Sequence, residues 1–430
     1  MKYIASIILT VLFVLPAITK AQESRFLSLE QCRQMAIENS ETVKIAEQNA
    51  AKAQSEKQAA KSSYTPSLSA SATGLYMIDN IEIASEMLPT DYTIYGGGMA
   101  SVTAQQAIYA GGKIRTGNQI AEIGISMANA NKELQHAELI YNTDRAYYQY
   151  LSVKAKLKLA KEYQNLLKEL EKVVNDSYEI GLVNRNELLK VQVKYNEASL
   201  QVQKAGTGLT LTKMALCQVI GININSAIEI NDSIASFQFV SENLGNINAT
   251  NRIEYQLLQS QVDIAEKNVK LVQGDYLPTL GGSVGYSHFL VGLKDMDNYD
   301  KGGLNAMVSL KIPITTFGER KGKTKAAKAG YEIKQMELQQ TAKYLQLEIE
   351  QARLNYIDAY AQVEMTKTSL EQANENMRIS DDNYRVGMET IVNVLEAKAE
   401  WQNAYSNKIE ALTNFKIQES NLLRVSNKLK

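Results

Sequence analysis

The spacing of apolar side chains along the chain alternates between two periods. Long stretches place apolar residues every three or four positions, which predicts helices with one apolar side. Shorter stretches alternate apolar residues with small or hydroxyl-bearing ones, which predicts strands with two different faces. In chain order the pattern predicts a helix, two strands, a long helix and a returning helix, and then the same elements again.

Four segments show the alternation that is typical of strands. Each approaches the roughly 9–11 residues with which a tilted strand crosses a bilayer. The polar segments 79–98 and 291–303 separate the strands of each pair and are predicted to be loops, the first with three consecutive glycines. The alternating apolar or small residues are Leu68, Ala70, Ala72, Gly74 and Tyr76; Ala100, Val102 and Ala104; Leu280, Gly282, Val284 and Tyr286; and Ala306, Val308, Leu310 and Ile312.

The longest helical pattern of each half spans 69 residues, from Gly112 to Gly181 and from Gly318 to Gly387 (181 − 112 and 387 − 318). At 1.5 Å per residue, a helix of this length measures roughly 100 Å, more than the width of a compact domain. Apolar seams at coiled-coil spacing run along both helices. The seam residues are Leu159, Tyr163, Leu166, Leu170 and Val173 in the first helix, and Leu345, Ile349, Ala352, Tyr356, Ala359 and Val363 in the second.

The segments that follow the long helices match each other. Tyr178–Leu189 aligns without gaps on Tyr384–Leu395, at an offset of 206 residues (384 − 178). Glycine ends a helix readily because it adopts the left-handed backbone conformation at little cost. The chain is therefore predicted to contain two copies of one helical hairpin, with Gly181 and Gly387 at the tips.

The N-terminus has the pattern of an export signal. Lys2 is followed by a mainly apolar run of 15 residues and by Thr19-Lys20-Ala21, a small-x-small cleavage site. We expect residues 1–21 to be removed as a signal peptide. Residues 22–220 then form the first repeat, 221–250 a linking segment and 251–430 the second repeat. Ser28 and Gln31 form a capping box that predicts the first helix.

Composition restricts the partners. The net charge of −1 provides no strong overall attraction to nucleic acid or to an anionic membrane. The chain has 23 tyrosines against 7 phenylalanines and 1 tryptophan. Tyrosines near the strand ends suit membrane–water belts, although packing at helix-to-strand corners explains them equally well; they are Tyr64, Tyr76, Tyr109, Tyr276 and Tyr286.

Cys32 and Cys217 could pair in an oxidising compartment, but two isolated cysteines on helix faces are favoured.

The sequence carries no signature of an enzyme. Its two histidines, His136 and His288, are too few and too far apart for a metal cluster or a catalytic triad. The glycines at 96–98 precede a strand, whereas a phosphate-binding loop precedes a helix and carries a lysine. We therefore expect no catalytic residue, no metal site and no cofactor.

The four strands raise a problem of closure. After the signal, no stretch approaches the ~18 consecutive apolar residues of a transmembrane helix. Open strand edges are not tolerated in hydrocarbon, and known membrane barrels have at least eight strands. The chain is therefore expected to share a barrel with copies of itself. Two copies give eight strands around a filled interior, and three give twelve around a lumen.

The order of these motifs resembles the TolC-like outer-membrane channels. The likeness rests on two repeats of a leucine-rich helix, a Tyr-x-Pro-x-Leu strand, a second strand, a long helix, a Tyr-x-x-Gly tip and a returning helix, over 27–427. It implies a mainly α membrane protein with four transmembrane β-strands and long coiled-coil helices per chain. It also implies a homotrimer in which a twelve-stranded β-barrel continues into a twelve-helix α-barrel.

The resemblance further implies a location and partners. The channel would lie in lipid of the bacterial outer membrane and extend into the periplasm. It would be the exit duct of a tripartite efflux pump or of a type I secretion system. A periplasmic membrane-fusion adaptor would couple it to an inner-membrane transporter of the resistance-nodulation-division or ABC type. The alternative is a structural coiled-coil periplasmic adaptor without its own pore, against which the doubled repeat and the four strands argue.

The resemblance also assigns residues. In TolC-like channels the tips dock the adaptor; the matching residues here are Ile180, Gly181, Leu182, Val386, Gly387 and Met388. Acidic rings beyond the second tip narrow the prototype's entrance, and the matching positions are Asn393 and Glu396, with Glu187 in the first repeat. Only one of the two second-repeat positions keeps an acid. A solvent-exposed helix face is the alternative interpretation of Glu396.

Overall fold

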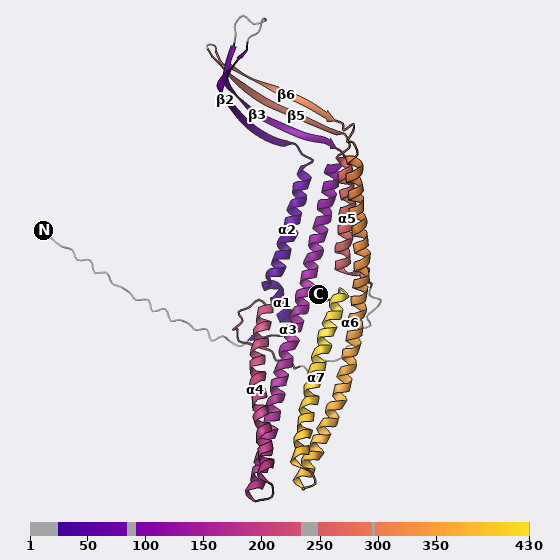
Figure 1. The fold of residues 1–430 in the computed structure, drawn as a ribbon. Coiled ribbons are helices and arrows are strands. Elements are labelled where there is room, and N and C mark those ends of the chain that lie inside the picture. Colours follow the sequence, from indigo (N-terminus) through magenta and orange to yellow (C-terminus); the bar gives the residue numbers. More distant parts are fainter. Residues whose placement is uncertain (1–24, 84–91, 234–247, 295–296, 430) are drawn as a thin grey trace, which may run out of the picture. The chain divides into compact units, whose positions relative to one another are not determined.

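The structure is a computed structural model that describes residues 25–83, 92–233, 248–294 and 297–429. The predicted signal peptide lies outside these residues. The chain alternates helices with antiparallel strand pairs, twice over (Figure 1). No helix in the described ranges combines the length and the apolar composition needed to cross a membrane.

The elements of the first repeat are followed by matching elements of the second. The first repeat contains α1 (Leu29–Asn39), α2 (Glu41–Ser62), β2 (Ser67–Ile83), β3 (Tyr92–Ala110), α3 (Lys113–Glu179) and α4 (Arg185–Val219). The second contains the short 3-10 helix η2 (Ala249–Asn251), α5 (Ile253–Gly274), β5 (Thr279–Leu293), β6 (Tyr299–Lys311), α6 (Glu319–Arg385) and α7 (Ile391–Val425). The short strands β1 (Arg25–Phe26) and β4 (Ile228–Glu229) pair in parallel.

The helix boundaries confirm the predicted repeat. Helices α3 and α6 each have 67 residues and start 206 positions apart (319 − 113). Helices α4 and α7 each have 35 residues at the same offset (391 − 185). Helices α2 and α5 each have 22 residues at an offset of 212 (253 − 41). The two repeats therefore fold alike although their sequences differ at most positions.

The chain forms two compact units, and each takes segments from both repeats. The hairpin unit comprises the described residues of Met1–Asn39, Asn142–Val240 and Ala359–Ile417. The sheet unit comprises those of Ser40–Tyr141, Ser241–Asp358 and Gln418–Lys430. The hairpin unit contains both tips, and the sheet unit contains the strands that the sequence predicts to cross a membrane.

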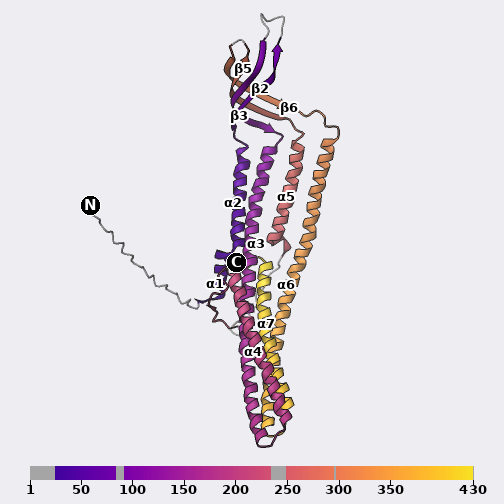
Figure 2. The ribbon, with the colours of Figure 1, turned by 60° about the vertical axis from the view of Figure 1, so that its left-hand side comes forward.

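One antiparallel sheet joins the two repeats within the sheet unit. Its strand order is β2-β3-β5-β6 (Figure 1). Figure 2 shows the four strands together above α2 and α5. The central pair, β3 and β5, brings the repeats together at Ser101 opposite Ser287. Strands β2 and β6 form the two edges of this sheet, and each has one paired neighbour among the described strands.

The predicted loops extend too far into the strands. Strand β2 continues to Ile83 and β3 begins at Tyr92, so much of segment 79–98 is paired strand; β5 and β6 likewise take much of 291–303. The glycines at 96–98 were interpreted as a sign of a loop. In the structure they lie in a strand, where the lack of a side chain lets the neighbouring strands come close. A Cβ at Gly96 would lie 2.6 Å from the carbonyl oxygen of Leu75, and one at Gly97 would lie 2.7 Å from that of Leu290.

The core of the hairpin unit corrects the first predicted seam. Leu159, Tyr163 and Leu170 are buried as predicted, but Leu167 and Val174 replace Leu166 and Val173 in the core. The mean spacing is therefore 3.75 residues ((174 − 159)/4), above the 3.5 of a strict coiled-coil repeat, because α3 packs against residues of both α4 and α7 in one cluster. The second seam is confirmed at five of its six positions, since Leu345, Ile349, Ala352, Tyr356 and Ala359 are buried, while Val363 is half-buried.

The start of α1 forms as predicted. The Ser28 amide donates to Gln31 Oε1 over 2.9 Å, and the Gln31 amide donates to Ser28 Oγ over 3.3 Å. The helix is interrupted at Ser40, whose hydroxyl caps α2 by accepting from the Val43 amide. Cys32 and Cys217 are buried free thiols, so the disulfide considered from the sequence is excluded.

Candidate functional site at the hairpin tips

Both tips are built by the same backbone turn. Gly181 has φ +79° and Gly387 has φ +77°, in the region where other residues are strained. The Leu182 amide donates to the Ser177 carbonyl over 2.9 Å, and the Met388 amide donates to the Asn383 carbonyl over 2.8 Å. These bonds close Schellman motifs, which satisfy carbonyls at the helix ends.

Each tip presents apolar side chains to solvent. The exposed fractions are 72 % for Ile180, 76 % for Leu182, 66 % for Val386 and 81 % for Met388. The two turns lie at the same end of the hairpin unit (Figure 1). Exposed apolar groups that gather at one place mark interaction sites. The six tip residues predicted from the sequence thus occupy one end of this unit.

Glu187 and Asn393 have a structural role that the sequence analysis missed. The Glu187 amide donates to Asn184 Oδ1 over 3.1 Å, and Asn184 Nδ2 donates to Glu187 Oε1 over 3.3 Å. In the second repeat the Asn393 amide donates to Thr390 Oγ1 over 3.4 Å. Both residues occupy the third helical position behind an N-cap, and the spacing of capping residues would have revealed this.

The two tips enclose a hollow of about 760 Å³. Its lining includes Glu187 from α4 and Tyr384 from α6. Burial raises the pKa of Tyr384 above its ordinary value, and the nearby Glu187 carboxylate raises it further. Tyr178, the equivalent residue of the first repeat, is more exposed. The second tip therefore packs its tyrosine against the first hairpin.

Glu396 lies in a different hollow. It lines a groove of about 680 Å³ between α4 and α7, together with the apolar residues Leu189, Val193 and Val392. Lys190, Lys194 and Glu197 line the same groove, and Lys194 pairs with Glu197 over 2.8 Å. The structure does not bring Glu396 and Glu187 into one acidic cluster, and Glu396 shares its groove with two cations.

The second hairpin contains a buried ion pair. Lys398 Nζ on α7 lies 2.6 Å from Asp381 Oδ2 on α6, and the Lys398 side chain is only 4 % exposed. Trp401 Nε1 donates to Asn374 Oδ1 over 2.6 Å one turn further along. The positions equivalent to Lys398 and Asp381 in the first repeat are Gln192 and Asn175. The two hairpins are thus fastened by different polar contacts.

The described residues contain no group of three or more His, Cys, Asp or Glu side chains that could hold a metal ion. His136 and His288 lie on α3 and β5, both within the sheet unit. His288 pairs with Asp300 on the neighbouring strand, 2.5 Å away.

Comparison with solved structures shows the fold. The chain is similar to the outer membrane protein VceC of Vibrio cholerae, with a TM-score of 0.77 and 17 % identity over 92 % of this chain and 95 % of that one. It is similar to the CmeC outer membrane channel of Campylobacter jejuni, with a TM-score of 0.78 and 17 % identity over 94 % of this chain and 86 % of that one. It is also similar to the open MtrE outer membrane channel of Neisseria gonorrhoeae, with a TM-score of 0.78 and 16 % identity over 94 % of this chain and 89 % of that one.

Sequence comparison identifies the family. A search of curated proteins gives no match. The family described as outer membrane efflux protein matches residues 32–222 and 250–428, which is most of the chain and includes both hairpins. The chain therefore belongs to the outer membrane efflux protein family.

Proposed function

We propose that this chain is the outer-membrane exit duct of a tripartite efflux pump or of a type I secretion system, and that it works as a homotrimer. Efflux across the outer membrane follows from family membership. The trimer, the adaptor and the inner-membrane transporter are the finer part of the proposal. The duct is passive, and the energy for export comes from the transporter.

The observation that carries the proposal is the four-stranded sheet with two free edges. Three copies that pair β2 of one with β6 of the next would satisfy every edge in a closed twelve-stranded barrel. Every residue of the edge strand β6 is exposed, and one face of the strand carries three large apolar side chains, which suits contact with lipid. They are Leu304, Val308 and Leu310.

The tips provide the docking surface for a periplasmic membrane-fusion adaptor. Ile180, Leu182, Val386 and Met388 are exposed apolar side chains held on rigid turns. An apolar face of an adaptor helix would bury them with little loss of conformational freedom. The adaptor would in turn hold an inner-membrane transporter of the resistance-nodulation-division or ABC type.

The entrance of the duct lies near Glu187, Asn393 and Glu396 in this proposal. Capping bonds order Glu187 and Asn393, while Glu396 projects from α7 into the groove beside Lys190. Such an entrance carries charges of both signs and is not a purely acidic ring. It would therefore select cations only weakly.

Fractionation and cross-linking test this function. The mature protein is expected in the outer-membrane fraction, and amine-reactive cross-linking of intact cells is expected to give a trimer band. Deletion of the gene should raise sensitivity to the pump's substrates, and the plasmid-borne gene should restore resistance. A protein that is released with the soluble periplasm would contradict the duct and favour an adaptor.

A further inference from the structure

The start of α6 carries a concentration of positive charge that the matching helix of the first repeat lacks. Residues 319–328 include five basic residues and one acid, a net charge of +4 (5 − 1). The equivalent residues 113–122 include two basic residues and one acid, a net charge of +1 (2 − 1). Because α3 and α6 have the same length and equivalent boundaries, the fold does not require these charges.

Local energetics do not account for the charge either. The positive end of the helix dipole lies at the N-terminus, where cations are disfavoured. Glu319 pairs with Lys323 over 2.6 Å. For the basic residues Arg320, Lys321, Lys325 and Lys328, the described part of the chain shows no ion pair. The dipole disfavours Arg320 and Lys321 in the first turn, and Lys325 and Lys328 add repulsion between like charges three and four residues apart.

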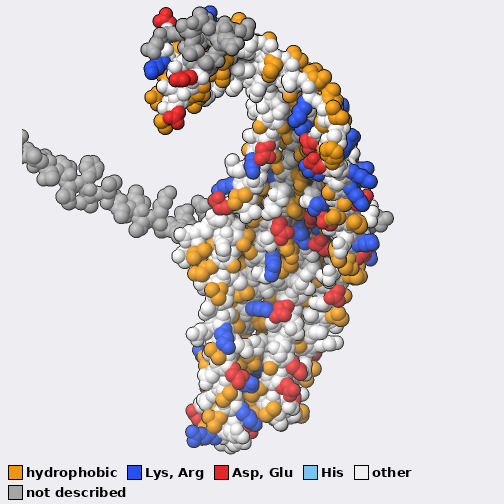
Figure 3. Space-filling model, turned by 45° about the horizontal axis from the view of Figure 1, so that its top comes forward, with side chains coloured by type: hydrophobic (Ala, Val, Ile, Leu, Met, Phe, Trp, Pro, Cys, Tyr) orange, Lys and Arg blue, Asp and Glu red, His pale blue; other side chains and the backbone are white. Residues whose placement is uncertain are grey.

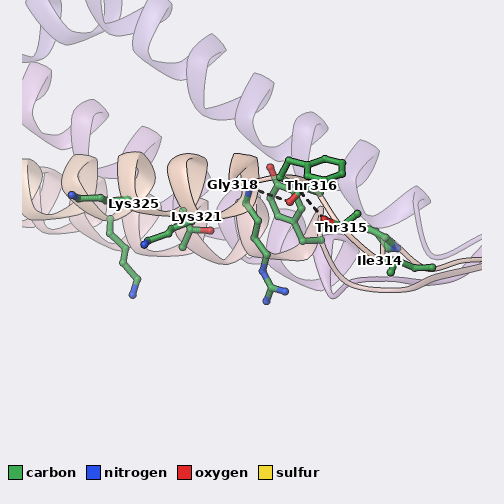
Figure 4. A pocket seen from close by; sticks show the side chains of 12 residues that line it. Ile314, Thr315, Thr316, Gly318, Lys321 and Lys325 are labelled. Carbon is green, nitrogen blue, oxygen red and sulfur yellow. Dashed lines mark hydrogen bonds between the residues drawn. The ribbon is translucent and has the colours of Figure 1, made fainter.

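The four cations share one side of the helix and line one hollow. Lys321, Lys325 and Lys328 are spaced four and three residues apart, which places them on the same face. With Arg320 they line a cavity of about 680 Å³, together with the hydroxyl-bearing residues Thr315, Thr316 and Tyr276. Figure 4 shows Lys321 and Lys325 extending away from the helix that begins just after Gly318.

Apolar groups lie directly beside this basic face. Ile314 is 94 % exposed and Phe317 is 96 % exposed, in the turn between β6 and α6. Phe317 has φ +42°, a strained conformation for a bulky residue, at the position where the first repeat has Gly111. The turn therefore holds an aromatic ring in solvent at a cost in free energy. The space-filling view shows basic and apolar side chains next to one another along its upper right edge, with acidic ones among them (Figure 3).

We infer that this basic face, defined as Arg320, Lys321, Lys325 and Lys328 with Ile314 and Phe317, binds the headgroups of anionic phospholipid in the periplasmic leaflet of the outer membrane. The inference rests on the proposed function, in which β6 crosses that membrane and ends at Lys311, eight residues before α6 begins. Basic side chains contact lipid phosphate while neighbouring apolar side chains enter the acyl boundary. The face fixes the depth of the channel in the membrane.

Retention of lipid by the purified full-length protein tests this inference. The protein in detergent is incubated with equal amounts of phosphatidylglycerol and phosphatidylcholine, and bound lipids are counted by native mass spectrometry. Wild-type protein should retain phosphatidylglycerol preferentially. The triple variant Lys321→Gln/Lys325→Gln/Lys328→Gln should lose at least about tenfold in this preference, since each basic residue near an anionic surface contributes roughly fivefold.

A control variant makes the same change of charge elsewhere. Lys161→Gln/Lys168→Gln/Lys172→Gln removes three exposed lysines of α3 in the hairpin unit and should keep the wild-type preference. Equal retention of the two lipids by wild-type protein, or equal losses in both triple variants, would overturn the inference. So would dissociation of the assembly in the first triple variant, because the lysines would then contact a second copy.

Two further experiments show whether a negative result concerns the lipid site or the proposed duct. Inorganic phosphate at fixed ionic strength should not displace phosphatidylglycerol; displacement would indicate a site for the free anion and overturn the inference. Single-channel recording in bilayers of phosphatidylcholine tests the duct by itself. Conductance without a lipid preference would refute the basic face and leave the proposed function intact, whereas absence of conductance would refute the duct.

Discussion

Lys190 on α4 and Glu396 on α7 occupy equivalent positions of the two repeats, 206 residues apart (396 − 190), and line the same groove. This position of the repeat thus carries a positive charge in the first copy and a negative charge in the second. In a trimer these positions would supply three cations and three anions in alternation. A ring of three cations and three anions has no net charge, and salt screens each charge over roughly 10 Å at moderate ionic strength.

The first prediction concerns this pair. Glu396→Gln should lower the ratio of cation to anion permeability by roughly twofold, because a Lys190 charge is left without its counterpart. Lys190→Gln should raise that ratio by a similar factor. The reversal potential in a salt gradient across a planar bilayer measures both. The exposed Glu364 serves as a control, and Glu364→Gln should leave the reversal potential unchanged. Shifts of the same sign in both groove variants would refute the entrance proposed here.

The second prediction concerns the tips. Gly387→Val places a β-branched residue at φ +77° and should cost about 1–2 kcal/mol locally. The turn should distort, and the exposed side chains of Val386 and Met388 should be displaced from the adaptor. Efflux-dependent resistance should fall while trimer assembly persists.

The matched control for the tip is Gly206→Val. Gly206 lies inside α4 at ordinary helical geometry, with no atom within 4 Å of an added Cβ. This variant should keep resistance near the wild-type level. If both variants lose resistance equally, the tip has no special role in docking.

The third prediction uses the first repeat as a template for the second. Lys398→Met leaves Asp381 without its partner in a mostly buried position, and should destabilise the protein by about 3 kcal/mol. The double variant Lys398→Gln/Asp381→Asn reproduces the Gln192 and Asn175 of the first hairpin. It should recover most of the loss, as judged by the midpoint of thermal unfolding. A double variant no more stable than the single one would show that the hairpins are not interchangeable here.

The sequence was informative where a pattern is repeated. The equivalent starts of α3 and α6, at Lys113 and Glu319, could be predicted because the same pattern of residues occurs twice in the chain, and each copy supports the interpretation of the other. The error at Gly96–Gly98 arose because glycine signals both a loop and a close strand contact, and only the partner strand distinguishes them. The seam error at Val173 arose because a helix that contacts two neighbours does not keep a strict heptad.

Only part of the candidate site could be predicted from the sequence. The tip turn follows from glycine chemistry, so Gly181 and Gly387 were identifiable. The capping role of Glu187 depends on its local partner Asn184 and could also have been found. The groove shared by Lys190 and Glu396 could not, because it depends on how two hairpins from distant parts of the sequence pack together.

The last prediction concerns Cys32, whose thiol is fully buried on α1. Its pKa is raised from 9.0 to about 12, mainly by burial and in addition by the charges of Asp232 and Cys217. The folded state therefore holds the neutral thiol, whereas the unfolded chain ionises near its ordinary pKa. The stability that this difference provides is complete below pH 9 and is lost as the pH rises from 9 to about 12.

The variant Cys32→Ala isolates this contribution from the buried tyrosines, whose raised pKa values give the same trend. It should be less stable than wild type at pH 8, because a buried side chain becomes smaller. The gap between the two proteins should then narrow between pH 9 and 12, since both chains gain the Cys217 thiolate on unfolding but only the wild-type chain also gains that of Cys32. Chemical denaturation at each pH measures the gap, and parallel curves would contradict the raised pKa. Iodoacetamide at pH 8 should leave Cys32 unmodified in the folded protein and label it after denaturation, because the reagent requires an exposed thiolate.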